Sequence, residues 1–269
     1  MAKTTRSPRS VPDGAAGWDD YAAFYDWENA QTVGHRDIGF WQRLATRVRG
    51  RVLELGAGTG RLTMPLARVA GRRVLGIDRS GPMLAVAARK RRRLPAAKRP
   101  RLMRGDIRAL PLPDASVQLV IAPYGMLQSL TRERDLQRVL REVARVLAPG
   151  GVFGVDLVTD LPAWDEYHRS VRLRERGPAG SRVTLIESVR QDRRRGLTIF
   201  DQEFVSTRQR TKTVRRFALA FRTLPVPAVA RRLERAGFDV EHRFGSYRGA
   251  AWTPTSDVWL LLARRRGRP

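Results

Sequence analysis

Three glycines and one acid lie close together where a short apolar run gives way to a helical pattern. Gly56, Gly58 and Gly60 alternate with single residues, and Glu54 stands two positions before the first of them. Glycine permits tight backbone angles and lets a ligand approach the main chain. Nicotinamide loops favour G-x-G-x-x-G spacing and seat a pyrophosphate, and phosphate-binding loops need Gly-Lys-Ser/Thr where this chain has Gly60-Arg61. The loop with its carboxylate therefore suits a positively charged nucleotide ligand.

Two further acids follow the next expected strands. Asp78 stands 18 residues after Gly60, and Asp106 follows Gly105 after another short run. An acid at the first position can accept hydrogen bonds from both ribose hydroxyls. The second can accept from an adenine amino group while Ile107 packs on the ring. The nucleotide site predicted around these acids includes the neighbouring Ala57, Arg79, Met83 and Pro123.

An alternation of apolar runs and helical patterns positions these residues. Strands are expected at 51–55, 73–77, 100–104, 117–122 and 152–158, with helices at 61–70, 82–93 and 132–147. Such alternation is typical of an α/β fold with a parallel sheet and helices on both faces. Ligands bind such sheets at the carboxyl ends of the strands, where the acids and glycines converge.

The pattern changes after the fifth strand. Three segments at 183–189, 197–205 and 214–221 alternate apolar and polar residues without helices between them, which predicts an inserted antiparallel β meander. A helix after Pro225 and strands at 239–244 and 256–263 close the chain. The predicted organisation is a disordered basic tail (1–17), an N-terminal helical lid (18–50), a core (51–160 and 226–265) and an inserted β lid (161–225).

The motif order resembles that of the class I S-adenosylmethionine-dependent methyltransferases. The resemblance is carried by Glu54-x-Gly56-x-Gly58-x-Gly60, Asp78, Gly105-Asp106 and 147–151, and it spans about residues 50–160 with the closing strands. It implies a Rossmann-like seven-stranded sheet ordered 3-2-1-4-5-7-6, with strand 7 antiparallel. It also implies S-adenosylmethionine as the cofactor.

The segment after the fourth strand is expected to face the methyl acceptor. Residues 122–128 lack the leading amide or acid and the second proline of the Asn/Asp-Pro-Pro-Tyr loop found in amino-group methyltransferases acting on bases or glutamine. They resemble the looser loop of small-molecule methyltransferases, which makes Tyr124 the first catalytic candidate. The predicted substrate pocket comprises Tyr21, Tyr124, Gln128, Arg248 and Trp252.

Aromatic residues of the N-terminal segment resemble the lid of small-molecule methyltransferases. Tyr25 and Trp41 are predicted cofactor contacts, with a role as helix core residues as the alternative. His35 lies near this lid and is the second catalytic candidate, as a general base. The three histidines and the acids form no cluster that predicts a metal site.

Composition restricts the chemistry. With no cysteine, the chain has no thiolate for cytosine-C5 methylation or for three-cysteine radical chemistry. No apolar stretch reaches the roughly 18 residues that span a bilayer, and no secretory signal is present, so a cytoplasmic location with no membrane partner is expected. Monomer and homodimer both remain open.

The net charge of +26 admits a nucleic-acid partner. Arginine dominates the basic residues and is dispersed at the ends of elements, which instead indicates a compositional origin. The favoured hypothesis is methyl transfer from S-adenosylmethionine to a nitrogen or oxygen of a small molecule. The alternatives are an RNA or DNA methyltransferase that uses the basic surface, a protein-directed methyltransferase, and a nonenzymatic protein that binds the cofactor.

Overall fold

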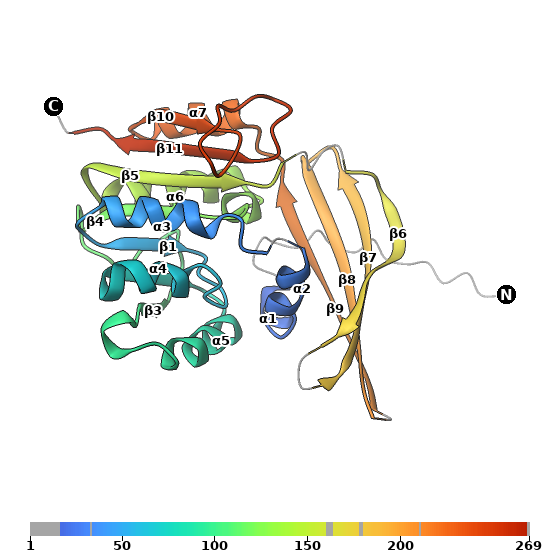
Figure 1. Cartoon of the computed structure of the whole chain (residues 1–269). Helices are drawn as coiled ribbons and strands as arrows, with labels where there is room; N and C mark the ends of the chain where they lie inside the picture. Colours follow the sequence, from blue (N-terminus) through green and yellow to red (C-terminus); the bar gives the residue numbers. More distant parts are fainter. Residues whose placement is uncertain (1–16, 33, 160–163, 178–179, 210, 268–269) are drawn as a thin grey trace.

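A computed structural model describes residues 17–32, 34–159, 164–177, 180–209 and 211–267. The chain forms an α/β core and a separate four-stranded antiparallel sheet, with two short helices between them (Figure 1). Nearly all of the expected tail at 1–17 lies outside the described residues.

The core contains a seven-stranded sheet that confirms the expected order. Strand order is β10-β11-β5-β4-β1-β2-β3, which is 3-2-1-4-5-7-6 when the core strands are numbered along the chain. The strand pairs from β3 through to β5 are parallel, whereas β11 is antiparallel to both β5 and β10. The bounds are β1 (Val52–Leu55), β2 (Val74–Asp78), β3 (Arg101–Arg104), β4 (Val117–Ala122), β5 (Leu147–Leu157), β10 (Phe238–Phe244) and β11 (Trp259–Arg265).

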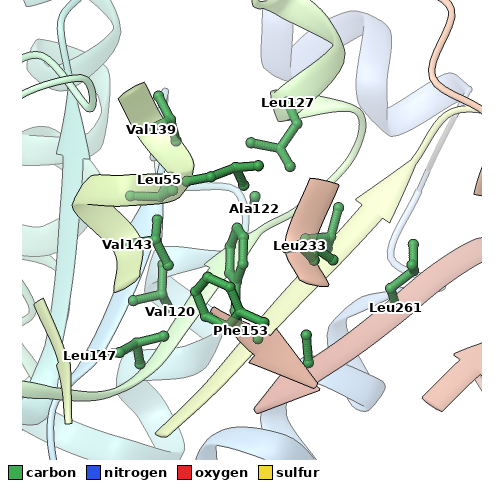
Figure 2. Packing of buried hydrophobic residues seen from close by; sticks show 14 of the residues in the cluster. Leu55, Val120, Ala122, Leu127, Val139, Val143, Leu147, Phe153, Leu233 and Leu261 are labelled. Atoms are coloured by element: carbon green, nitrogen blue, oxygen red, sulfur yellow. The ribbon is translucent and has the colours of Figure 1, made fainter. Parts of the chain in front are cut away.

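Helices cover both faces of this sheet because each presents one apolar side. Helix α6 buries Leu136, Val139, Leu140 and Val143 on one face, where α7 packs beside it (Figure 2). The opposite face is covered by α3, α4 and α5. The bounds are α3 (Ile38–Arg47), α4 (Thr63–Ala70), α5 (Gly81–Arg92), α6 (Glu133–Val146) and α7 (Val226–Arg235), with 3₁₀ turns η1 (Gly71–Arg73), η2 (Ala96–Lys98) and η3 (Met126–Ser129).

The inserted sheet has one strand more than the sequence predicts. Its order is β6-β7-β8-β9, with bounds β6 (Tyr167–Arg176), β7 (Arg182–Asp192), β8 (Leu197–Arg208) and β9 (Thr211–Arg222). β6 is an edge strand with mostly exposed, charged residues and two register shifts against β7. The absence of a clean apolar alternation explains why the sequence pattern misses it. β5 also starts earlier than expected, at Leu147 rather than Val152.

The N-terminal helices α1 (Trp18–Tyr21) and α2 (Tyr25–Gln31) pack against the inserted sheet, lying between it and the core (Figure 1). The ring of Phe24 stacks on Phe204 of β8 with centroids 4.2 Å apart, and the indole Nε1 of Trp27 donates to the carbonyl of Arg176. Met83 of α5 belongs to the same apolar cluster. These helices therefore connect the inserted sheet to the core.

No helix in the described part of the chain combines the length and apolar character needed to cross a membrane.

Candidate cofactor and acceptor site

A cavity of about 630 Å³ opens at the carboxyl ends of the core strands and extends beneath the inserted sheet. Its lining includes many of the residues predicted from the sequence. They are Tyr21, Tyr25, Glu54, Gly56, Ala57, Gly58, Asp78, Arg79, Met83, Asp106, Ile107, Pro123 and Tyr124. The core supplies one side of the cavity, and α1, α2 and β6–β9 supply the other.

Asp78 fixes the glycine loop at the end of β2. Its Oδ2 accepts from the backbone N–H of Gly58 at 2.8 Å, and its Oδ1 accepts from that of Ser80 at 2.8 Å. Gly56, Gly58 and Gly60 all have φ between +54° and +77°, which side chains rarely adopt. Each carboxylate oxygen has a second lone pair, so Asp78 can hold the loop and still accept from a ligand.

Glu54 lies in the floor of the cavity and is almost fully buried. The hydroxyl of Thr63 donates to its Oε2 at 2.5 Å. Burial raises the pKa of Glu54 to about 8, against the lowering effects of Thr63 and Arg61. A cationic ligand group beside this carboxyl would favour its ionised form.

Asp106 has a side-chain partner that the sequence does not suggest. Arg108 donates to both carboxylate oxygens, including a 2.6 Å bond from Nη2 to Oδ2, and it also lies 3.3 Å from Asp135. This guanidinium lowers the pKa of Asp106. The apolar Ile107 and Met83 lie in the same wall and suit a planar ring.

Tyr124 follows β4 in a conformation that tertiary contacts enforce. Its φ is +49°, unusual for a residue with a side chain, and Gly125 follows at +68°. Gln128 fixes this turn, because its amide donates to the carbonyl of Val158 at 3.0 Å and accepts from that residue's N–H at 2.7 Å. Burial raises the pKa of Tyr124. Gln128 thus supports the turn and does not itself line the cavity.

Arg61, directly after the glycine loop, links the core to the N-terminal segment. Its guanidinium forms two bonds to Asp37, of 2.8 and 2.7 Å, and both side chains are buried. It also lies over the Tyr124 ring, 5.7 Å from the centroid, and its charge acts on the pKa of the Tyr25 hydroxyl. Desolvation raises the pKa of Tyr25 to about 12. Arg61 is not predicted from the sequence, although it adjoins the glycine motif.

A second contact joins α2 to the same loop. The hydroxyl of Thr59 donates to Asp26 at 2.7 Å, and the Lys90 ammonium donates to the same carboxylate oxygen at 2.7 Å. Tyr25 and Glu28 lie on the same helix as Asp26, one before it and two after it. The position of α2 therefore determines which side chains reach the cavity.

Trp41 contacts the core rather than the cavity. It is fully buried on α3, and a Cβ at position 154 would come within 2.6 Å of its ring, so Gly154 of β5 makes room for the indole. Trp41 is therefore a core residue of its helix, which was the alternative to the predicted cofactor contact. Gly60 likewise packs against Met64 and Ala87, where a Cβ would lie 2.8 Å from Met64 Cε.

Three further predicted residues also lie outside the cavity lining. His35 and Arg248 are exposed. Trp252 packs against the core, with its ring 6.4 Å from that of Trp259. The sequence places these residues in a helix or a loop near the site, but it does not determine the direction in which their side chains point. Among the described residues, no group of three or more His, Asp or Glu side chains is placed to hold a metal ion.

Comparisons with known proteins agree with this geometry. Residues 52–151 match a protein-family model described as a methyltransferase domain. The 2-phytyl-1,4-naphtoquinone methyltransferase of Synechococcus elongatus is 38% identical over 150 residues, which cover 52% of this chain and 61% of that enzyme. The chain thus matches only about three fifths of that curated relative's length.

Solved structures extend the likeness across the insertion. The CcbJ methyltransferase from Streptomyces caelestis superposes with a TM-score of 0.80 at 21% identity, over 95% of this chain and all of the other. The glycopeptide N-methyltransferase MtfA, in complex with S-adenosyl-L-homocysteine, is 27% identical with a TM-score of 0.54, over 86% of this chain and 87% of that one.

The chain has the fold of the class I S-adenosylmethionine-dependent methyltransferases, and its residues 52–151 match a methyltransferase-domain model. S-adenosylmethionine is the methyl donor of this class.

Proposed function

We propose that this protein transfers a methyl group from S-adenosylmethionine to a nitrogen or oxygen of a small molecule held beneath the inserted sheet. The main support is the single cavity that joins the glycine loop to a space walled by α2 and β6–β9. Its volume of about 630 Å³ falls in the usual range of small-molecule sites, roughly 300–1,000 Å³. The name of MtfA supports nitrogen as one possible acceptor atom.

The residues of the core side fit the methyl donor. Asp78 would accept from the ribose hydroxyls, Glu54 would receive the ammonium of the methionyl part, and Met83 with Ile107 would contact the adenine. When bound, S-adenosylmethionine supplies an electrophilic methyl group on a sulfonium. The protein's part is to align the acceptor with that methyl group and to exclude water. Tyr25 and Tyr124, which line the cavity, would form the walls between donor and acceptor.

We further propose that, of the predicted lid segments 18–50 and 161–225, helices α1 and α2 and strands β6–β9 act together as the acceptor lid of a core formed by 51–160 and 226–265, to which α3 adds. The shared apolar cluster of α1, α2 and the inserted sheet supports this division.

The acids Glu28 and Glu187 line the lid side of the cavity. They would repel a polynucleotide phosphate, so the acceptor space favours a small molecule despite the net charge of +26.

The proposal is tested by titrating the purified protein with S-adenosylmethionine and S-adenosylhomocysteine in a calorimeter, and by following methyl transfer to small-molecule mixtures by mass spectrometry. Binding of both nucleotides together with a methylated product supports the proposal. Binding without transfer to any acceptor would favour a nonenzymatic role. Transfer only to added RNA, with a steep salt dependence, would favour the nucleic-acid alternative.

Binding of S-adenosylmethionine is expected to release about one proton at pH 6.5. Glu54, whose pKa is about 8, is protonated at that pH, and an approaching ammonium group lowers its pKa below the ambient value. Raising the pH toward 8 should therefore strengthen the Glu54 contribution to binding. The measurement is the binding heat in buffers of different ionisation enthalpy.

The Glu54→Gln variant should show little or no proton release, whereas Glu203→Gln, on the outer side of the inserted sheet, should behave as the parent protein. Unchanged proton release in Glu54→Gln would show that another group receives the ligand's charge.

A further inference from the structure

The lid side of the cavity carries a group of hydrogen-bond acceptors from three elements. Glu28 comes from α2, Glu187 from β7 and Gln202 from β8, and all three line the cavity. Glu187 is 7% exposed and Gln202 is 5% exposed. Glu187 and Gln202 are cross-strand partners on β7 and β8, and the packing of α2 on the inserted sheet adds Glu28 to the same wall.

Protein donors satisfy the two acids only in part. The Tyr21 hydroxyl donates to Glu28 at 2.8 Å. Glu187 accepts from the Tyr167 hydroxyl and from the Gln202 amide, the latter at 2.9 Å. A carboxylate has about four acceptor positions, so both acids can accept further bonds.

The amide of Gln202 has an acceptor without a partner. Its nitrogen is used by Glu187, while its Oε1 is buried and has no hydrogen-bond partner in the described part of the chain. Buried polar groups in folded proteins are almost always paired, and an unpaired one is costly. Because Gln202 belongs to the cavity lining, a ligand that presents an N–H or O–H group to this residue would satisfy the unpaired oxygen.

The charges in this part of the cavity favour a cation. Desolvation raises the pKa of Glu28 to about 7, and the charge of Glu187 adds to the rise while Tyr21 opposes it. The charge of Glu28 also helps to raise the pKa of the Tyr124 and Tyr167 hydroxyls. The compensating cation at this wall is Arg172, half exposed, whose Nε lies 3.8 Å from Glu187 and whose guanidinium stacks on Tyr167.

We propose, on the basis of the proposed small-molecule methyl transfer, that the acceptor is an amine. Its ammonium group is received between Glu28 and Glu187, and a further N–H or O–H of the same molecule donates to Gln202 Oε1. Glu28 takes the proton that the nitrogen must lose before it can be methylated.

The chemistry balances with the groups named. The bound ammonium gives one proton to the Glu28 carboxylate and becomes a neutral amine. The nitrogen lone pair then forms the new N–C bond as the C–S bond of the donor breaks, and the electron pair of that bond stays on sulfur. The product is the N-methylated ammonium, and Glu28 returns its proton to solvent.

The test compares matched amines and alcohols. D-glucosamine with D-glucose, and benzylamine with benzyl alcohol, are titrated into the protein loaded with S-adenosylhomocysteine, and methyl transfer to each is measured by mass spectrometry. We expect the amines to bind and be methylated and the alcohols to do neither. Equal behaviour of amines and alcohols, or no binding of either amine at millimolar concentration, would overturn the proposal.

Charge-neutral variants identify the acids involved. Glu28→Gln and Glu187→Gln should each lower kcat/KM for the amine at least tenfold at pH 7. The matched control is Glu203→Gln on β8, whose carboxylate pairs with Arg169 and Arg216 outside the cavity, and which should stay within twofold. Parent-like kcat/KM in both cavity variants would overturn the proposal.

The proton transfer has its own readout. General-base catalysis typically contributes 10²–10⁴-fold, so the Glu28→Gln deficit should be about 100-fold at pH 7. It should shrink to a few-fold at a pH one unit above the amine's own pKa, where the nitrogen is already neutral. A deficit independent of pH would indicate a merely structural role for Glu28.

Calorimetric binding of S-adenosylmethionine to the same samples separates the two proposals. If the parent protein does not bind S-adenosylmethionine, the proposed function itself is contradicted. Retained nucleotide binding without amine preference would contradict only the amine assignment.

Discussion

Replacing Asp78 by alanine is expected to weaken S-adenosylmethionine binding by about 10²–10⁴-fold. The variant would lose the acceptors that we propose for the two ribose hydroxyls. Each hydrogen bond to a charged group is worth about 1.5–3 kcal/mol, and each 1.4 kcal/mol corresponds to tenfold in affinity. It also frees the N–H groups of Gly58 and Ser80, so the glycine loop loses its fixed shape. The dissociation constant from calorimetry measures the effect.

Asp114→Ala provides the control, because this carboxylate is exposed and pairs with Arg145 away from the cavity. Thermal denaturation would show whether Asp78→Ala still folds. A folded Asp78→Ala protein with an affinity within threefold of the parent would mean that the nucleotide is held elsewhere.

The second large effect is expected on stability. Arg61→Met should lower the free energy of unfolding by about 3–5 kcal/mol, because it leaves the buried Asp37 without its partner. The Asp37 side chain is only 2% exposed, so water cannot replace the two lost hydrogen bonds. Chemical denaturation measures the change.

Two further variants serve as controls for this prediction. The double variant Arg61→Met/Asp37→Leu should recover much of the loss, since an apolar pair pays no desolvation cost. Arg266→Met removes the partner of Asp239 at the surface and should cost about 1 kcal/mol or less. A cost for Arg61→Met no greater than that of Arg266→Met would contradict the role assigned to the buried pair.

The residues on the core side of the site could be predicted from the sequence, because their positions depend on short motifs at the ends of consecutive strands. Glycines at a strand-to-helix turn and acids at strand ends must meet when consecutive strands are parallel neighbours. Glu54, Gly58 and Asp78 accordingly line one cavity. The strand order of the core sheet was predicted from the family resemblance, not from these short motifs.

The lid side was not predictable in the same way. Glu28 and Glu187 are separated by more than half of the chain, and only the packing of α2 on the inserted sheet brings them together. Strand β6 shows no clear alternation, and Gln202 is one of several polar residues on an otherwise regular strand. The one usable signal was the position of Glu28 three residues after Tyr25, on the same face of a helix.

Trp41 and Gln128 illustrate another limit. Both lie in segments that border the site, yet Trp41 packs against β5 and Gln128 fixes a turn. A sequence pattern shows that a helix has a buried face, but it does not distinguish burial in the core from burial against a ligand. That difference depends on how the helix is rotated, which tertiary packing decides.

The outer strand of the inserted sheet has a consequence for how the protein behaves at high concentration. An open strand edge is a template for pairing with another chain, and proteins commonly protect such edges with charges and bulges. β6 has both, because Arg169, Arg172 and Arg174 lie along it and its pairing with β7 shifts register twice. Growth of this sheet into intermolecular β-aggregates is thereby opposed at its β6 edge.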